Sequence, residues 1–308
     1  MKVFVTGASG WIGSAVVAEL VGAGHQVVGL ARSDASANAI SAAGAEVVRG
    51  TTDDLDVLRS AAEASDGVIN LAFNHDIAFS GGAQAAVDSE RRAVEIFGDV
   101  LAGSNRPLVI ASGMIGLKPG QVVTENDGHY SSAPGAEMSG LARRHETAEF
   151  TLALAQRGVR SSIVRLAPTN HGDGDNGFMR IIVDGSRAGG KAAYVGDGAQ
   201  RWPAVHRLDS AHLFCLALEK APAGSTLHAN AEEGVAIRDI AEMIGRHLNL
   251  PVESVSIDEA AQQFGMIGRF MAVDSPVSSV LTRELMGWEP KQPGLLEDLD
   301  QGHYFKGR

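Results

Sequence analysis

The stretch Met1-Lys-Val-Phe-Val-Thr-Gly-Ala-Ser-Gly-Trp-Ile-Gly13 opens the chain and decides its fold. Within it, Lys2–Thr6 is a short run of apolar, β-branched and aromatic residues, which is typical of a buried parallel strand. From Trp11 an apolar pattern with helical spacing runs to about Ala23. Three glycines join these two segments. The stretch therefore predicts a strand, a tight turn and a helix.

The glycines of this turn have the spacing G-x-x-G-x-x-G. Gly7 suits a tight turn, Gly10 lets the backbone approach a pyrophosphate, and Gly13 lets the helix pack close to the strand. The free amides at a helix start, together with the helix dipole, favour a phosphate. We therefore predict a dinucleotide at this turn; a glycine-rich turn without a ligand is the alternative. The expected contacts are Gly7, Ser9, Gly10, Trp11, Ile12 and Gly13.

Strand-like and helix-like segments alternate through the first half of the chain. Further strands are expected at Gln26–Leu30, Glu46–Arg49, Gly67–Leu71, Pro107–Ala111 and Val159–Leu166. Helices are expected at Ala35–Ala43, Asp54–Ala64, Ala83–Ala102 and Ser139–Gln156. This alternation predicts an α/β fold with a doubly wound parallel sheet, the Rossmann architecture. Ligands of such sheets bind beyond the carboxyl ends of the strands, so the residues there are the candidates for function.

The alternation stops after Pro168. Residues 169–175 and 185–200 are glycine-rich and are expected to be loops with a helix between them. We therefore predict a nucleotide-binding domain over residues 1–168, returning at about 205–230. Residues 169–204 and 231–308 are expected to form a smaller, interleaved substrate-binding lobe.

Composition narrows the class of protein. The 308 residues carry a net charge of −11, which argues against nucleic acid or an anionic membrane as the main partner. The single cysteine, Cys215, excludes an intrachain disulfide and fits a reducing cytoplasm. No segment has the apolar length of a membrane span, and the first strand begins where a signal peptide would lie. A soluble cytoplasmic protein is expected.

Several motifs, taken together, resemble the extended short-chain dehydrogenase/reductase family. They are Thr6-Gly7-x-x-Gly10-x-x-Gly13, Asn70-Leu71-Ala72, Ala111-Ser112-Gly113, Arg165-Leu166-Ala167-Pro168, Val205-His206-x-x-Asp209 and Leu285-x-Gly287-Trp288-x-Pro290. Asn74-His75-Asp76 and Gly196-Asp197-Gly198-x-x-Arg201-Trp202 look like an atypical, epimerase/dehydratase-like branch. The resemblance implies a nicotinamide cofactor and a small-molecule substrate. It also implies a homodimer formed by the two long helices, Ala83–Ala102 and Ser139–Gln156.

The end of the second strand reports on the cofactor. An acid there would bind the adenosine ribose of NAD, but this chain has Arg32 and Ser33, which suit a 2′-phosphate. NADP(H) is therefore favoured over NAD(H); a surface arginine without a ligand is the alternative. The family's acid near the adenine would fall at about Thr51, where Thr51 or Asp53 could substitute. The resemblance also places Asn70, Leu71, Ala72, Ala111, Ser112, Arg144, Pro168, Thr169 and Asn170 at the cofactor.

The family's catalytic set is only partly present. Ser112 is the candidate for polarising a substrate carbonyl, although an adjoining register puts Gly113 there, and Ser112 could merely bond loop backbone. The Tyr-x-x-x-Lys pair is absent, because its positions fall near Gly140 and Arg144. Arg144 could hold the ribose hydroxyls but cannot donate a proton at neutral pH. The alternative makes Arg143 and Arg144 a solvated helix face paired with Glu146 or Glu149.

Another group must then donate the proton. His75 is the first candidate, because histidine titrates near neutral pH and His75 follows the fourth strand. Tyr130 and His171 are the others. The expected substrate pocket comprises Asn74, His75, Gly113, His171, Phe178, Met179, Tyr194, Arg201 and Trp202. No metal site is expected, because the histidines lack ligand spacing and the turn around Asp173 and Asp175 is not an EF-hand loop.

Three functions remain open from the sequence. The first is an NADP(H)-dependent oxidoreductase that transfers a hydride between nicotinamide and a small carbonyl or alcohol. The second is an NAD(P)-dependent sugar-nucleotide epimerase or dehydratase. The third is a sensor that binds NADP(H) without turnover, which the missing tyrosine and lysine would favour.

Overall fold

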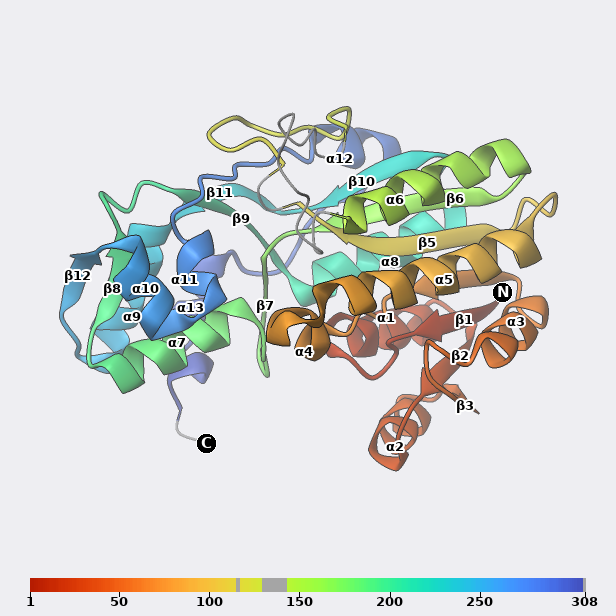
Figure 1. Cartoon of the computed structure of the whole chain (residues 1–308), viewed down its shortest axis with the longest axis horizontal. Coiled ribbons are helices and arrows are strands. Elements are labelled where there is room, and N and C mark those ends of the chain that lie inside the picture. The colour runs from red at the N-terminus through yellow and green to blue at the C-terminus, as the bar shows by residue number, and fades with distance from the viewer. Residues whose placement is uncertain (115–116, 129–142, 307–308) are drawn as a thin grey trace.

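A seven-stranded parallel sheet forms the centre of the larger half of the molecule (Figure 1). The computed structural model describes residues 1–114, 117–128 and 143–306. From one edge to the other, the strands are β10 (Ser225–Ala229), β6 (Arg160–Leu166), β5 (Pro107–Gly113), β4 (Gly67–Asn70), β1 (Lys2–Thr6), β2 (Gln26–Ala31) and β3 (Glu46–Arg49). The predicted doubly wound sheet is confirmed.

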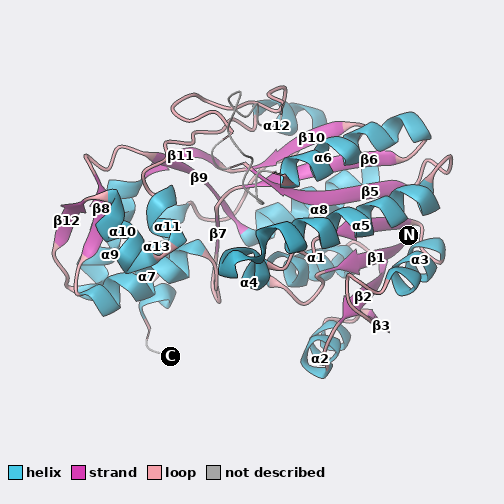
Figure 2. Cartoon of the chain, viewed as in Figure 1, coloured by secondary structure: helices cyan, strands magenta, loops and turns pink. Residues whose placement is uncertain are grey.

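Helices cover both faces of this sheet (Figure 2). On one face, α1 (Trp11–Gly22), α2 (Asp34–Ala42) and α8 (Arg207–Lys220) pack in a core with the alternate strand residues Val109, Val164 and Leu227. On the other face, α3 (Leu55–Glu63), α5 (Ala83–Leu101) and α6 (Arg144–Ala153) pack on Leu108, Ile110 and Ile163. Strands covered on both faces need apolar residues at successive positions, which is the pattern that the first strand carries.

The register of the strands places three polar residues side by side near the carboxyl edge of the sheet. Ser112 on β5 lies opposite Arg165 on β6, and Arg165 lies opposite His228 on β10. Register partners of neighbouring parallel strands point to the same face, and this row faces the side covered by α6. β5 extends two residues further than predicted, so Ser112 lies inside the strand, near its carboxyl end, and not after it.

A smaller lobe follows along the chain. Its elements are β8 (Ala192–Val195), β12 (Val252–Val255), α7 (Phe178–Gly189), α9 (Ile237–Leu248), α10 (Ile257–Phe264), α11 (Met266–Phe270), α13 (Leu295–Asp300) and the short helix η3 (His303–Phe305). They share a separate apolar core. A three-stranded sheet, β11 (Glu232–Ala236), β9 (Arg201–His206) and β7 (Thr169–His171), leads from this lobe towards the central sheet (Figure 1).

Three details differ from the expectations. Residues 185–200 are not one loop, because α7 continues to Gly189 and β8 follows. Val277, Met286 and Trp288 pack in the core of the central sheet, so this segment, with α12 (Val280–Met286), belongs with the larger half. The described part of the expected helix 139–156 starts at Arg144; residues 139–142 lie outside the described residues. Within the described ranges, no helix combines the length and apolar character needed to cross a bilayer.

Candidate active site at the carboxyl edge of the sheet

The first turn is closed so tightly that only glycine fits at two positions. Gly7 has φ +67°, and a Cβ there would lie 2.9 Å from the Ala72 nitrogen. A Cβ on Gly13 would lie 1.9 Å from the Gly7 oxygen. Helix α1 begins after Gly10, which has no side chain to cap it, and Ser9 and Gly10 are exposed. The amides of this helix start are therefore open to a phosphate.

The end of β4 is fixed beneath this turn. Thr6 Oγ1 donates to Asn70 Oδ1 at 2.6 Å and accepts from the Ala72 nitrogen at 3.2 Å. Asn70 Nδ2 is buried and has no hydrogen-bond partner within the part of the chain described. Asn70, Leu71 and Ala72 thus form a rigid floor next to the glycine turn, where the sequence predicts the cofactor.

The end of β2 carries an uncommitted arginine. Arg32 is exposed and forms no hydrogen bond or ion pair with any described residue. The nearest acid in the sequence, Asp34, is paired with Arg49 of β3. Ser33 caps α2 by accepting from the Ser36 nitrogen at 3.2 Å. An arginine is therefore open to an anion here, while the neighbouring acid is engaged.

The residues after β3 form hydrogen bonds with residues of the protein itself. Thr51 donates from its nitrogen and its hydroxyl to Asp54 Oδ2, at 2.7 and 2.9 Å. Asp53 accepts from Ser89 Oγ and from Arg92, and these bonds lower the pKa of Asp53. Thr51 is thus held in the turn that starts α3, at the position expected for the adenine.

Ser112 lies at the carboxyl end of β5 with its side chain buried. Its Oγ has no hydrogen-bond partner among the described residues. A buried hydroxyl without a partner costs about 1–3 kcal/mol. Ser161 and Ser162 of β6 have the same property, but they lie opposite Leu108 and Val109, in the first half of β5. Only Ser112 of these three is at the edge where ligands bind.

Arg144 contacts two elements, α5 and β5, and the loop that follows β4. Its Nε and Nη2 bond the Glu90 carboxylate of α5 at 2.9–3.0 Å, and Nη2 donates to the Ala111 oxygen at 3.3 Å. Its guanidinium lies 4.1 Å from the centre of the Phe73 ring. Burial raises the pKa of Glu90 above its ordinary value, and the opposing effect of the Arg144 charge and hydrogen bonds is smaller. The solvated-face alternative therefore holds for Arg143, which pairs with Glu146, but not for Arg144.

His75 begins a short helix, α4 (His75–Ile77), directly after β4, and is exposed. Its ring meets the edge of Phe73 at 5.0 Å between centres. Phe73 thus links His75 to Arg144. Asn74 caps this helix through the Ile77 nitrogen at 3.1 Å. Gly113 ends β5, and the third proton-donor candidate, Tyr130, lies outside the described residues.

Two histidines close to the Ser112 row were missed by sequence reasoning. His228 Nδ1 bonds the Ser278 oxygen at 2.7 Å, and its Nε2 lies 3.1 Å from Arg165. Burial lowers the pKa of His228 to about 4. Burial, together with Arg165 and Arg144, also lowers the pKa of His145 to about 4. The buried Ala148, three residues after His145, is the signal that could have placed His145 on the inner face of α6.

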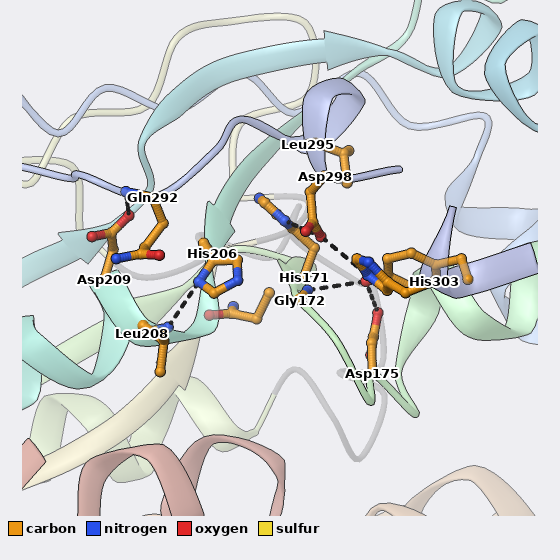
Figure 3. Close-up of polar contacts among 12 residues, drawn as sticks. His171, Gly172, Asp175, His206, Leu208, Asp209, Gln292, Leu295, Asp298 and His303 are labelled. Carbon is orange, nitrogen blue, oxygen red and sulfur yellow. Dashed lines mark hydrogen bonds and ion pairs between the residues drawn. The ribbon is translucent and has the colours of Figure 1, made fainter. Parts of the chain in front are cut away.

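His171 lies in a second polar group, beneath the edge (Figure 3). Its Nδ1 is 2.9 Å from Asp298 Oδ2, and both side chains are almost completely buried. Tyr304 Oη donates to Asp175 Oδ2 at 2.9 Å and accepts from the Gly172 nitrogen at 3.1 Å. Burial raises the pKa of Asp175. We call His171, Asp175, Asp298 and Tyr304 the C-terminal cluster; it holds the end of the chain against β7.

The expected pocket residues of the smaller lobe are either completely buried or partly exposed. Met179 and Trp202 are completely buried, so they pack the lobe's core and do not face a substrate. Phe178 packs beside Trp202, with 5.9 Å between ring centres. Tyr194 is partly exposed beneath Arg238, and Arg201 bonds Asp274 through Nε and Nη2 at 3.0 and 2.8 Å.

The segment after β6 is held by its own bonds. Thr169 Oγ1 donates to the Pro203 oxygen at 2.6 Å, and Asn170 Nδ2 donates to the Ala167 oxygen at 2.6 Å. Trp11 Nε1 donates to the Asn170 oxygen at 2.8 Å. Residues 168–170 therefore lie against the start of α1, which places them beside the predicted phosphate site.

One possible metal-ligand group occurs in the described chain. His25, Cys215 and Glu219 bring three ligand atoms within 4.8 Å of one another, at the amino edge of the sheet. Burial and Glu219 raise the pKa of Cys215 to about 12, so its sulfur is a thiol. This group is far from the carboxyl edge and takes no part in the candidate site.

Comparison with known proteins agrees with this geometry. A model of the NAD dependent epimerase/dehydratase family matches residues 3–230. The chain belongs to this family. The predicted resemblance to extended short-chain dehydrogenases/reductases is thereby confirmed, and with it membership of a family of NAD-dependent enzymes.

Related proteins match the whole chain. Protein C2A9.02 of Schizosaccharomyces pombe is 44% identical over 99% of this chain and 100% of its own length. Protein YLL056C of Saccharomyces cerevisiae is 43% identical over 97% and 98%. Among solved structures, the UDP-glucose 4-epimerase of Thermotoga maritima with UDP-glucose has a TM-score of 0.76 at 17% identity, covering 99% of this chain and 98% of its own. The dTDP-glucose 4,6-dehydratase DesIV of Streptomyces venezuelae, with NAD and TYD bound, has a TM-score of 0.76 at 19% identity, over 97% and 96%.

Proposed function

We propose that the protein is an NADP(H)-dependent oxidoreductase that transfers a hydride between nicotinamide and a small carbonyl or alcohol substrate. The observation that carries this proposal is the buried hydroxyl of Ser112 at the carboxyl end of β5, which has no hydrogen-bond partner in the described part of the chain. A substrate oxygen would satisfy that hydroxyl, and a hydroxyl donor polarises a carbonyl for hydride attack.

The residues at the edge fit a nicotinamide dinucleotide. The glycine turn leaves no room for side chains and opens the α1 amides to the pyrophosphate. Arg32 supports NADP(H) over NAD(H), because its guanidinium has no partner among the described residues and suits a 2′-phosphate, while the nearby Asp34 is paired with Arg49. When bound, the nicotinamide supplies or accepts the hydride.

Three side chains of the protein polarise the substrate oxygen, stabilise its developing charge and supply the proton. Ser112 donates its hydrogen bond to the substrate oxygen. Arg144 is held by Glu90 and Ala111, and keeps positive charge close to that oxygen as negative charge develops. His75 is exposed beside Phe73 and supplies the proton, since Arg144 cannot.

The test is to offer NADPH, deuterated on the transferred position, with a panel of aldehydes and ketones. We expect deuterium on the product carbon and loss of NADPH absorbance, with a lower rate in His75→Ala. The opposite result, tight NADPH binding with no transfer to any carbonyl, would leave the sensor function in its place.

A sugar-nucleotide epimerase or dehydratase is the second candidate. The structural neighbours that bind UDP-glucose or TYD favour it. Such an enzyme regenerates its cofactor in each cycle. Cofactor that copurifies at full occupancy, with conversion of a sugar nucleotide and no net NADPH loss, would establish it over the oxidoreductase.

The remaining predictions accompany this function. A small molecule is the partner, and neither nucleic acid nor a membrane is expected. A homodimer through α5 and α6, a cytoplasmic location and a division into two parts complete the proposal. The nucleotide-binding domain comprises residues 1–168, about 205–230 and the segment with Val277, Met286 and Trp288, and the substrate lobe comprises the remainder. Light scattering of the purified chain tests the dimer directly.

A further inference from the structure

Arg207 is the first residue of α8 and is partly exposed. Its guanidinium carbon lies 4.2 Å from the centre of the Trp11 ring. Trp11 is the first residue of α1, so the contact joins the starts of two helices. Both helices begin at the carboxyl edge and pack side by side on one face of the sheet (Figure 1). Arg207 therefore lies beside the amides that open onto the predicted phosphate site.

The stack on Trp11 fixes the position of this guanidinium. Trp11 cannot turn freely, because Nε1 donates to the Asn170 oxygen at 2.8 Å. An arginine stacked on an aromatic face keeps its N–H edges free to bind an anion and loses less freedom when it does so.

Those edges have no acceptor among the residues described. Burial lowers the pKa of Arg207, and the carboxylates of Asp173 and Asp175 raise it, but neither acid bonds it. Asp175 is engaged with the Gly177 nitrogen at 2.6 Å and with Tyr304. Asp173 is exposed. A partly buried guanidinium without an acceptor, next to a helix start, is suited to a ligand that carries two negative charges.

We propose that Arg207 binds the pyrophosphate of the dinucleotide and so completes the phosphate site from the side of α8. This assignment rests on the dinucleotide site of the proposed function. Arg32 lies elsewhere along the edge of the sheet. It follows β2, which is on one side of β1, whereas α8, which carries Arg207, packs over β4, β5 and β6 on the other side of β1. Arg32 and Arg207 thus hold different phosphates of NADP(H).

The test separates the two arginines with two probes, measured by calorimetry on the full-length chain. ADP-ribose contains the pyrophosphate but no 2′-phosphate, whereas adenosine 2′-monophosphate contains only the latter. Arg207→Gln should weaken ADP-ribose about tenfold or more, as expected for the loss of a charge-assisted hydrogen bond. It should leave adenosine 2′-monophosphate unchanged. Arg32→Gln should do the reverse.

Two further variants sharpen this result. Trp11→Leu should weaken ADP-ribose as Arg207→Gln does, and the double variant should lose little more, because both remove one stacked unit. Asp173→Asn should tighten ADP-ribose slightly, because an exposed carboxylate near the guanidinium opposes the anion. Thermal unfolding of each variant checks that the fold is retained.

The outcomes are distinct. Wild-type binding of ADP-ribose with unchanged affinity in Arg207→Gln would overturn the role of Arg207 and leave the dinucleotide site intact. Weakening of both probes by Arg207→Gln would also overturn it, because the effect would then not be specific to the pyrophosphate. Wild-type protein that binds neither ADP-ribose nor NADPH would instead remove the proposed function.

Discussion

The row Ser112–Arg165–His228 and the C-terminal cluster both contain buried hydroxyl, histidine and charged side chains. They differ in how these groups are satisfied and in what covers them. In the C-terminal cluster, Asp175 and Asp298 bond Tyr304 and His171, and apolar residues of the smaller lobe surround them. His171 Nε2 has no partner within the described chain, but the side chain is completely buried, 5.4 Å from the His206 ring.

The row differs from the cluster at its Ser112 end. Ser112 Oγ has no hydrogen-bond partner in residues 1–114, 117–128 and 143–306, and it lies at the sheet edge next to Arg144, whose side chain is 18% exposed. The comparison teaches that residue type alone does not separate a structural histidine from a serine that is a candidate for function. What separates them is whether an unsatisfied group can be reached by a ligand.

The largest effect is expected in the C-terminal cluster. Asp298→Ala should lower the free energy of unfolding by about 3–5 kcal/mol, because it leaves His171 buried without its partner. Denaturant titration measures the change. Asp300→Ala is the matched control, since Asp300 pairs with His247 at the surface and should change stability by less than about 1 kcal/mol. Equal effects of the two variants would mean that the buried pair is no stronger than a surface one.

Ser112→Ala should have the opposite signature. We expect kcat/KM for carbonyl reduction to fall about 10²–10³-fold, as for loss of one donor to a developing oxyanion. Stability should stay the same or rise, since the substitution removes a buried hydroxyl without a partner. Ser161→Ala removes such a hydroxyl away from the edge and should leave the rate unchanged. A clear loss of stability in Ser112→Ala would place Ser112 with the structural group.

Acid should weaken the fold through the histidines near the row. His228 and His145 have folded-state pKa values of about 4, below the ordinary 6.5. As the pH falls from 6.5, the unfolded chain binds protons first, so the stability that these two histidines contribute is fully present above pH 6.5 and is lost between pH 6.5 and 4. The loss should be on the order of 3 kcal/mol per histidine.

His228→Gln should remove the part of the pH dependence of stability that comes from His228. Glu90 and Asp175, whose pKa values are raised, contribute equally in both proteins and cancel in the comparison. Urea unfolding at several pH values measures the difference between wild type and variant. Identical slopes would show that folding does not lower the pKa of His228.

The smallest effect concerns cofactor choice. Arg32→Gln should weaken NADPH binding about tenfold, by loss of a charge-assisted bond to the 2′-phosphate, and leave NADH unchanged. Titration with both cofactors measures the two affinities. Arg49→Gln is a useful companion, because it releases Asp34 from its ion pair and should also disfavour NADPH. Equal affinities for NADPH and NADH in the wild type would contradict the preference.

The sequence by itself determined the glycine-rich turn between the first strand and helix, and the alternation of strands and helices that gives the parallel sheet. These depend on local properties: glycines without room for a Cβ, apolar runs covered on both faces, and helix starts. It also predicted Ser112 at the carboxyl edge, because the carboxyl ends of parallel strands meet there, whereas Arg144 was placed at the cofactor only by the family resemblance.

Only the tertiary structure decided what those side chains bond. Arg144 meets Glu90, 54 residues away in the sequence, His171 meets Asp298, 127 residues away, and Arg207 meets Trp11. Such pairs have no local pattern, since they depend on how the smaller lobe and the helices pack on the sheet. The chain alone names the groups that can do chemistry; burial and pairing decide which of them remain free to do it.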